Sequence, residues 1–248
     1  MTLEQFFTEN PKVALAFSGG VDSAYLLYAA KASGAQVCAY YVKTPFQPRF
    51  EYDDALRLAQ DLGVTMTTLT VDVLADSTIT ANPKNRCYYC KKKIFTAILE
   101  QARLAGFPLV MDGTNASDDY ADRPGMQALS ELGIRSPLRE CGLTKADIRR
   151  LSKEAGLFTH SKPAYACLAT RIPAGTAITA ELLSKTERSE AFLKSLGFTD
   201  FRIRHLDSGA KLEVRQEQLP LLLARREAIV TKLKEDYTTV LLDLEVRQ

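Results

Sequence analysis

The sequence lacks the features typical of membrane, secreted and duplex-binding proteins. No apolar run approaches the ~20 residues that a membrane-spanning helix needs. Residues 1–5 form neither a basic segment nor an apolar signal core, so we expect a cytoplasmic protein with no membrane partner. Lys and Arg number 32 against 30 Asp and Glu, a net charge of +2. This balance is not the footprint of a protein that binds a long nucleic-acid duplex, and we expect no nucleic-acid partner.

Cysteine and histidine are also scarce. The five cysteines are an odd number in a chain of 248 residues and do not indicate a disulfide framework. The two histidines are His160 and His205. There is no internal repeat or low-complexity segment, and 46% of the residues are hydrophobic. That content is sufficient for one large core or two modest ones.

Short apolar runs alternate with helical patterns through the first two-thirds of the chain. This alternation predicts an α/β fold, in which a parallel sheet carries helices on both faces. We place this first domain at 1–172. The expected strands are 13–17, 37–42, 64–71 and 109–111, and the expected helices are 24–32, 52–62, 94–105, 125–132 and 145–154.

The pattern changes after 172–176, which contains Pro173 and Gly175 and is a candidate hinge. Beyond it we expect a small α+β domain at 176–248, an antiparallel sheet packed by two helices, for substrate binding or homo-oligomer contacts. Its strands pair through the turn Asp207-Ser208-Gly209. The expected order is helix 180–196, strand 201–206, strand 211–215, helix 219–235 and strand 238–246.

The apolar run 13–17 ends in a glycine-rich turn, Ser18-Gly19-Gly20-Val21-Asp22-Ser23, before a helical pattern. A strand, such a turn and a helix together present backbone N–H groups to phosphate. The Asp22 carboxylate would repel polyphosphate unless a cation lay between them, which points to Mg²⁺. The turn matches neither the P-loop nor the Rossmann pattern. A second loop, with Gly113, Thr114 and Asn115, follows the strand 109–111 at the same edge of the sheet.

Three cysteines are candidates for chemistry. Cys87 and Cys90 are spaced to share one face of a helical turn, and Cys167 lies far along the chain. A chance pair, a redox dithiol and a metal site remain open, although zinc lacks an obvious fourth ligand. Three thiolates with one open position suit an iron–sulfur cluster. Alternatively, Cys167 is a nucleophile whose pKa is lowered by the neighbouring cations Lys162 and Arg171. We expect the other two, Cys38 and Cys141, to be inert.

The turn 18–23 resembles the pyrophosphate loop of the ATP pyrophosphatase superfamily, and most of the chain resembles the LarE-type ATP-dependent sulfurtransferases of nickel-pincer nucleotide synthesis. The motifs that carry the second resemblance are Asn85-Arg86-Cys87-Tyr88-Tyr89-Cys90-Lys91, 112–119 with Arg123-Pro124-Gly125, Ser136-Pro137-Leu138, Lys162-Pro163-Ala164, Ala166-Cys167-Leu168 with Arg171, and Arg202-Ile203-Arg204-His205.

This resemblance implies a reaction. ATP adenylates a carboxylate of pyridinium-3,5-dicarboxylate mononucleotide, pyrophosphate leaves, and sulfur displaces AMP to give a thiocarboxylate. In some members a cysteine gives up its own sulfur, whereas members with CxxC and a third cysteine use a [4Fe–4S] cluster. The pattern of Cys87, Cys90 and Cys167 favours the cluster type.

The resemblance also implies a role for particular residues. ATP would contact Ser18, Gly19, Gly20, Val21, Asp22 and Ser23, together with Gly113, Thr114, Asn115 and Arg123, with Mg²⁺ at Asp22. The anionic groups of the substrate call for guanidinium donors, and Arg202 and Arg204 alternate onto one face of their strand. The expected substrate-binding residues are Arg171, Arg202, Arg204, Glu190 and Glu213.

Three other functions share the loop. A tRNA thiolase would keep the three cysteines and add an RNA-binding surface, with salt-sensitive tRNA binding. An ammonia-using ligase of the NAD or GMP synthetase kind would not need the cysteines. A nucleotide sensor would bind ATP without releasing pyrophosphate.

Overall fold

The computed structural model describes residues 1–118 and 124–245. The chain forms two compact units. One consists of Met1–Val73 and Asn85–Lys162, and the other of Leu74–Lys84 and the residues from Pro163 onward.

The first unit is built on a four-stranded parallel sheet. Its strands are β1 (Lys12–Ala16), β2 (Gln36–Lys43), β3 (Met66–Thr70) and β4 (Val110–Met111), in the order β3-β2-β1-β4. In this register Ala14 of β1 lies opposite Cys38 of β2 and Val110 of β4. All four strands lie where the apolar runs predict them, and the α/β fold is confirmed.

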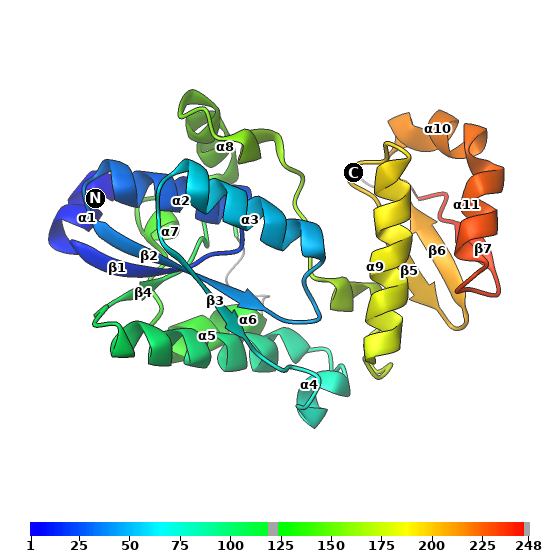
Figure 1. The fold of residues 1–248 in the computed structure, drawn as a ribbon, viewed down its shortest axis with the longest axis horizontal. Coiled ribbons are helices and arrows are strands. Elements are labelled where there is room, and N and C mark those ends of the chain that lie inside the picture. The colour runs from blue at the N-terminus through cyan, green and yellow to red at the C-terminus, as the bar shows by residue number, and fades with distance from the viewer. Residues whose placement is uncertain (119–123, 246–248) are drawn as a thin grey trace. The chain divides into compact units, whose positions relative to one another are not determined.

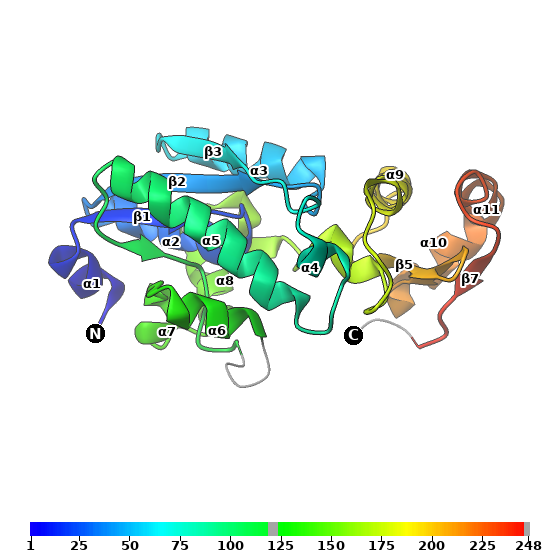
Figure 2. The ribbon, with the colours of Figure 1, turned by 90° about the horizontal axis from the view of Figure 1, so that it is seen from below.

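Helices cover both faces of this sheet (Figures 1 and 2). On one face lie α2 (Val21–Ala32), α3 (Arg49–Asp61) and α8 (Lys145–Glu154), and on the other α5 (Arg86–Leu104) and α6 (Pro124–Glu131). The short helices are α1 (Leu3–Glu9), α7 (Pro137–Glu140) and the 3₁₀ turn η1 (Phe158–Ser161). Successive side chains of a strand point to opposite faces of the sheet, so the core has one part on each face. Leu15 and Tyr41 pack with α2 and α3, whereas the hydroxyl of Tyr40 donates to Gln101 O of α5 at 3.5 Å.

The strand order reverses between β1 and β4. From β1 the chain moves outward to β2 and β3, and it then returns to pair β4 with the other edge of β1. The loops that follow β1 and β4 therefore lead to helices on opposite faces. In open α/β sheets ligands bind at this kind of switch point, beyond the carboxyl ends of the strands.

Helix α5 begins earlier than the expected start at 94, at Arg86. The apolar periodicity visible in the sequence starts at Phe95, which is buried with Ile98 and Ala102. The two turns before it bury only Arg86, so they carry no periodic apolar signal. Cys87 and Cys90 therefore lie within the helix and not before it.

The second unit has an α+β core. Helix α9 (Ala180–Ser195) packs on a sheet of β5 (Arg202–Leu206), β6 (Gly209–Glu213) and β7 (Val240–Leu242) through residues that include Leu193, Ile203 and Leu212. The remaining helical segments are α4 (Ser77–Thr80), η2 (Leu168–Arg171), η3 (Gln216–Gln218), α10 (Leu219–Ala224) and α11 (Arg226–Leu233).

Two details of this unit differ from the sequence prediction. The expected helix 219–235 is two helices, α10 and α11, which meet at Arg225 with φ −106° and ψ 9°. The expected antiparallel sheet is mixed. The hairpin β5–β6 is antiparallel, but β7 pairs parallel with β6, because α10 and α11 form a crossover that returns the chain to the same end of the sheet.

The segment 74–84 is held within the second unit by Asn82. This residue is 1% exposed, has φ +54°, and donates from Nδ2 to the carbonyls of Ile172, Pro173 and Thr176 at 3.3, 2.8 and 3.1 Å. The candidate hinge 172–176 is therefore tied by hydrogen bonds to a segment far away in sequence. The assignment of substrate binding or homo-oligomer contacts to the C-terminal part remains a prediction.

Of the helices in the described part of the chain, none combines the length and the apolar character that crossing a membrane requires.

His205 makes the stability of the second unit depend on pH. Its ring is buried, with Nε2 2.7 Å from Thr186 Oγ1. Burial is the largest effect on the pKa of His205 and lowers it, and the positive charge of the nearby Lys185 lowers it too. A backbone hydrogen bond raises the pKa, but the net direction is downward. The unfolded chain therefore binds the proton more readily than the folded chain, so stability is full above about pH 6.5 and falls as the pH decreases below it.

We expect His205→Gln, which can keep the hydrogen bond to Thr186 without titrating, to flatten this dependence. Melting followed by circular dichroism between about pH 7.5 and pH 5.5 measures it. An equal loss of melting temperature in the variant and the parent would contradict this account.

Candidate active site at the glycine-rich loop

The turn 18–23 connects β1 to α2 and is held by its own serines. Ser18 Oγ lies 3.1 Å from Ser23 Oγ and accepts a hydrogen bond from Gly20 N at 3.3 Å, while Ser23 Oγ donates to Gly20 O at 3.2 Å. The N-cap residue of α2 is Gly20, which has no side chain that could accept hydrogen bonds from the first turn of the helix. The N–H groups of the first turn of α2 have no acceptor within the helix, so the loop presents donors and a partial positive charge to an anion.

Gly19 lets the turn lie directly against α3. Its φ is +72°, and a Cβ at this position would lie 2.9 Å from Ala55 Cβ and 3.0 Å from Ala55 Cα. A larger residue would meet backbone that cannot move without displacing α3. Both the left-handed conformation and the close approach require glycine here.

The second loop meets the first. A Cβ on Gly113 would lie 2.9 Å from Ser23 N and 3.2 Å from Ser23 Cα, so the backbone after β4 lies directly on the start of α2. Buried Asp112 fixes this loop, because its carboxylate accepts from Thr114 Oγ1 at 2.5 Å and from Ser136 Oγ at 2.6 Å. The sequence-predicted residues Gly113, Thr114 and Asn115 thus lie beside the turn 18–23. Arg123 lies outside the described residues.

Asp22 stands at the start of α2 with two donors on its carboxylate. Asn115 Nδ2 donates to Oδ1 at 3.3 Å, and Lys145 Nζ lies 2.5 Å from Oδ2. The side chain is 23% exposed. A single accessible carboxylate beside a phosphate site fits Mg²⁺, which proteins commonly hold with one or two carboxylates while phosphate oxygens and waters complete its shell.

A second lysine also contacts the loop. Lys162 Nζ donates to Gly19 O at 3.4 Å and pairs with Asp54 Oδ2 of α3 at 2.7 Å. Neither Lys145 nor Lys162 is among the ATP-binding residues that the sequence pattern predicts. Lys145 directly follows Thr144, the N-cap of α8. That capping signal predicts where the helix begins but not which distant carboxylate its lysine meets.

The three candidate cysteines belong to different units. Cys87 is exposed and Cys90 half-buried in the first turns of α5, where Arg86 Nη2 lies 4.0 Å from Cys87 Sγ. Cys167 is half-buried in the second unit. No three His, Cys, Asp or Glu side chains among residues 1–118 and 124–245 are grouped to hold a metal ion. A cluster shared by the three cysteines is therefore not shown and stays a prediction.

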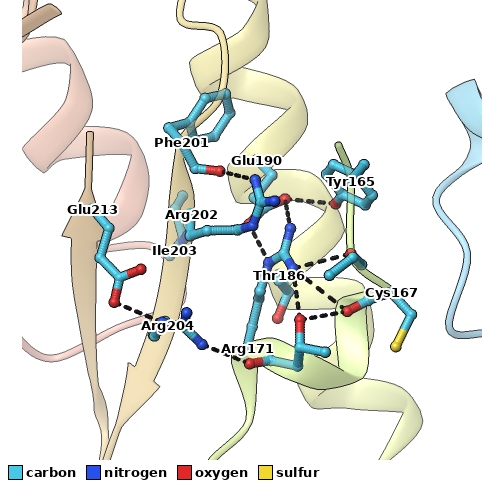
Figure 3. A network of polar contacts seen from close by, with 12 residues as sticks. Tyr165, Cys167, Arg171, Thr186, Glu190, Phe201, Arg202, Ile203, Arg204 and Glu213 are labelled. Carbon is cyan, nitrogen blue, oxygen red and sulfur yellow. Dashed lines mark hydrogen bonds and ion pairs between the residues drawn. The ribbon is translucent and has the colours of Figure 1, made fainter. Parts of the chain in front are cut away.

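The chain around Cys167 is held by a buried ion pair (Figure 3). The side chain of Arg171 is 0% exposed; it donates from Nε and Nη2 to the two carboxylate oxygens of Glu190 at 2.7 and 3.1 Å. Its Nη1 donates to Ala166 O at 3.0 Å and to Thr170 Oγ1 at 2.7 Å. Burial alone would lower the pKa of Arg171, but the hydrogen bonds and charge of Glu190 outweigh it and the pKa is raised.

Glu190 has further partners in the same network. Its carboxylate accepts from the hydroxyl of Tyr165 at 2.6 Å and from Ile203 N of β5 at 3.1 Å. All three guanidinium nitrogens of Arg171 and both oxygens of Glu190 are thus bonded to the protein. In this structure the pair joins α9, β5 and the Cys167 segment.

The other two arginines differ in exposure. Arg202 is buried and donates to Phe201 O at 2.7 Å and Ala164 O at 2.9 Å. Arg204 donates to Glu213 Oε1 at 2.6 Å and to Thr170 O at 2.9 Å, but its side chain is 41% exposed. Arg204 is therefore the most accessible to an anionic ligand of the three arginines that the sequence singles out.

The buried pair predicts a stability effect. Glu190→Gln removes the charge that compensates buried Arg171, and breaking such a pair costs about 3–5 kcal/mol. We expect the denaturation midpoint of the second unit to fall accordingly in a urea titration followed by circular dichroism. Glu181→Gln is the matched control, because Glu181 lies on the same helix but pairs with Lys185 at the surface, and surface pairs contribute little. Equal midpoints for the two variants would contradict a structural role of Glu190.

Comparison with known proteins agrees with this geometry. The family described as "Queuosine biosynthesis protein QueC" matches residues 12–96, which include the turn 18–23. A tRNA-specific 2-thiouridylase MnmA of Clostridium perfringens is 28% identical over 61% of the chain and 53% of its own length.

Two relatives match nearly the whole chain. An uncharacterized protein of Synechocystis sp. is 35% identical over 98% of the chain and 92% of its own length. A pyridinium-3,5-bisthiocarboxylic acid mononucleotide synthase of Lactiplantibacillus plantarum is 32% identical over 98% of the chain and 89% of its own length. With identity at this level extending through both units, the chain belongs to the LarE-type family of ATP-dependent sulfurtransferases.

Proposed function

We propose that this enzyme adenylates a carboxylate of pyridinium-3,5-dicarboxylate mononucleotide with ATP and converts it to a thiocarboxylate, a step in nickel-pincer nucleotide synthesis. The observation that carries the proposal is the 32% identity to a pyridinium-3,5-bisthiocarboxylic acid mononucleotide synthase over 98% of the chain. The paired loops at the switch point of the sheet support the use of ATP.

Adenylation solves a chemical problem, because a carboxylate is a poor electrophile. A carboxylate oxygen of the substrate attacks the α-phosphorus, the bond to the β-phosphate oxygen breaks, and pyrophosphate leaves. A sulfur nucleophile then attacks the acyl carbon and AMP departs with the electron pair. Mg²⁺ held at Asp22 would neutralise charge on the phosphates. The N–H groups at the start of α2 would bind the phosphates, with Gly19 and Gly113 allowing the close approach.

Arg204 is our candidate for binding an anionic group of the substrate. Its 41% exposed side chain supports this role, and Glu213, which accepts from Arg204 Nε at 2.6 Å, would orient the guanidinium. Arg202, Arg171 and Glu190 already bond to neighbouring chain. For these three we propose that they shape the site by fixing the segment 164–171.

The source of the sulfur divides the proposal in two. In one form, Cys167 Sγ attacks the acyl-adenylate to give a thioester, and loss of the Cα proton breaks the Cβ–S bond, which leaves dehydroalanine and a thiocarboxylate. In the other, Cys87, Cys90 and Cys167 hold a [4Fe–4S] cluster. Intact mass after turnover detects the first as loss of one H₂S. An anaerobic visible spectrum that depends on Cys87 detects the second.

We expect Cys167→Ala to separate the two halves of the reaction. Release of pyrophosphate with ATP, Mg²⁺ and the dicarboxylate mononucleotide would continue and leave the acyl-adenylate, whereas release of AMP and formation of the thiocarboxylate, both measured by mass spectrometry, would stop. Cys141→Ala is the matched control and retains both, because burial raises the pKa of that thiol and makes it unreactive. Parent protein that never forms AMP with this substrate would overturn the proposed function.

A second candidate is thiolation of tRNA, favoured by the similarity to a tRNA-specific 2-thiouridylase over 61% of the chain. It predicts tRNA binding that weakens steeply with salt. Sulfur incorporation into tRNA, and none into the dicarboxylate mononucleotide, would select it.

A further inference from the structure

Two lysines from the C-terminal end of the first unit contact the turn 18–23. We propose that Lys145 and Lys162 bind the β- and γ-phosphates of ATP and stabilise the departing pyrophosphate, and that Arg149 is a positioning residue for Lys162. This inference rests on the proposed function, because it concerns the same nucleotide site.

The composition of the turn creates the need for such residues. A P-loop contains its own lysine, which reaches the β- and γ-phosphates, whereas the turn 18–23 has no cation and one carboxylate, Asp22. Backbone N–H groups supply only partial charges. Negative charge grows on pyrophosphate as its bond to the α-phosphorus breaks, and preorganised cations stabilise that charge most effectively. The cations must therefore come from elsewhere in the fold.

Lys145 is placed by the start of α8. Thr144 caps this helix, and the reciprocal bonds of Thr144 with Asp147 lower the pKa of Asp147 and keep it charged. Lys145 N donates to Ser117 Oγ at 3.0 Å, which ties the helix to the loop after β4. From this fixed backbone the ammonium reaches Asp22 Oδ2 and remains 34% exposed, so it is accessible to a ligand.

Lys162 is placed by the same helix, one turn further on. Arg149 Nη1 donates to His160 O at 2.7 Å, and its Nη2 donates to Lys162 O at 2.9 Å. These bonds fix the chain at the point from which the side chain of Lys162 runs to Gly19 O and Asp54. Its ammonium also lies 5.7 Å from the ring centroid of Phe50. Helix α8 thus places one lysine directly and the other through Arg149.

The present partners of both ammonium groups are replaceable. Asp22 and Asp54 are 23% and 34% exposed, and ion pairs with access to water contribute little to stability. The triphosphate carries several negative charges, and its oxygens form charge-assisted hydrogen bonds with lysine. Binding of the nucleotide would move the two ammonium groups from carboxylate to phosphate and leave Asp22 for the metal ion.

The affinities for ATP and AMP test this inference, because AMP lacks the phosphates in question. We expect Lys145→Gln and Lys162→Gln each to weaken ATP binding, measured by calorimetry with Mg²⁺, by roughly 10-fold or more. Affinity for AMP would change by less than about 3-fold. Lys145→Arg, which keeps a cation, would restore most of the affinity for ATP.

Arg149 has a closely matched control in its neighbour. Arg149→Gln is expected to weaken ATP binding and spare AMP binding, and the double variant with Lys162→Gln would bind ATP no worse than Lys162→Gln alone. Arg150→Gln would change neither affinity, because Arg150 pairs only with Asp147 and Glu154 along the exposed side of α8 in the described part of the chain.

The outcomes separate this inference from the proposed function. If the parent binds ATP more tightly than AMP and the lysine variants keep that ratio, Lys145 and Lys162 are structural partners of Asp22 and Asp54, and the inference is wrong. If the parent binds ATP but releases no AMP with the dicarboxylate mononucleotide, the proposed function is wrong while the phosphate role of the lysines stands. Retained AMP binding shows that each variant is folded.

Discussion

The site depends on one backbone contact, the approach of Gly113 to the first turn of α2. A Cβ at position 113 would lie 2.9 Å from Ser23 N, so the loop after β4 lies against the loop after β1 with no side chain between. The reversal of strand order between β1 and β4 brings these loops together, and Asp112 holds the second of them through Thr114 and Ser136. The position of Asn115 beside Asp22 follows from this contact.

Much of this arrangement could be predicted from the sequence, because it depends on local signals. Apolar runs and capping residues give the four parallel strands and the start of α8 at Lys145. The position of the turn 18–23 follows from the strand before it. The start of α5 at Arg86 could not be predicted, because its first turns bury only an arginine and have no apolar period. The parallel pairing of β7 depends on how the chain returns through α10 and α11, which composition does not encode.

For the charged residues too, the sequence predicts which residues matter but not which tertiary contacts they make. The family resemblance predicts substrate-binding roles for Arg171, Glu190, Arg202 and Arg204. The structure shows which of these side chains are buried and which are accessible, with exposures of 0%, 6%, 7% and 41%. The pairing of Arg171 with Glu190 across 19 positions is a tertiary contact without a sequence period. Lys145 meets Asp22 across 123 positions, so a lysine at the first position of a helix gives no sign of its partner.

The excursion of residues 74–84 has a practical consequence for dissecting the molecule. The chain leaves the first compact unit after Val73 and returns to it at Asn85, and Asn82 is bonded to three carbonyls of the segment 172–176. No single cut in the polypeptide can therefore yield both halves intact. Expressing the C-terminal half alone would leave those carbonyls without their amide donor, and a truncated N-terminal half would expose a buried asparagine. To produce the halves separately, residues 74–84 must be joined to the C-terminal piece. In the N-terminal piece a linker must then connect Val73 directly to Asn85.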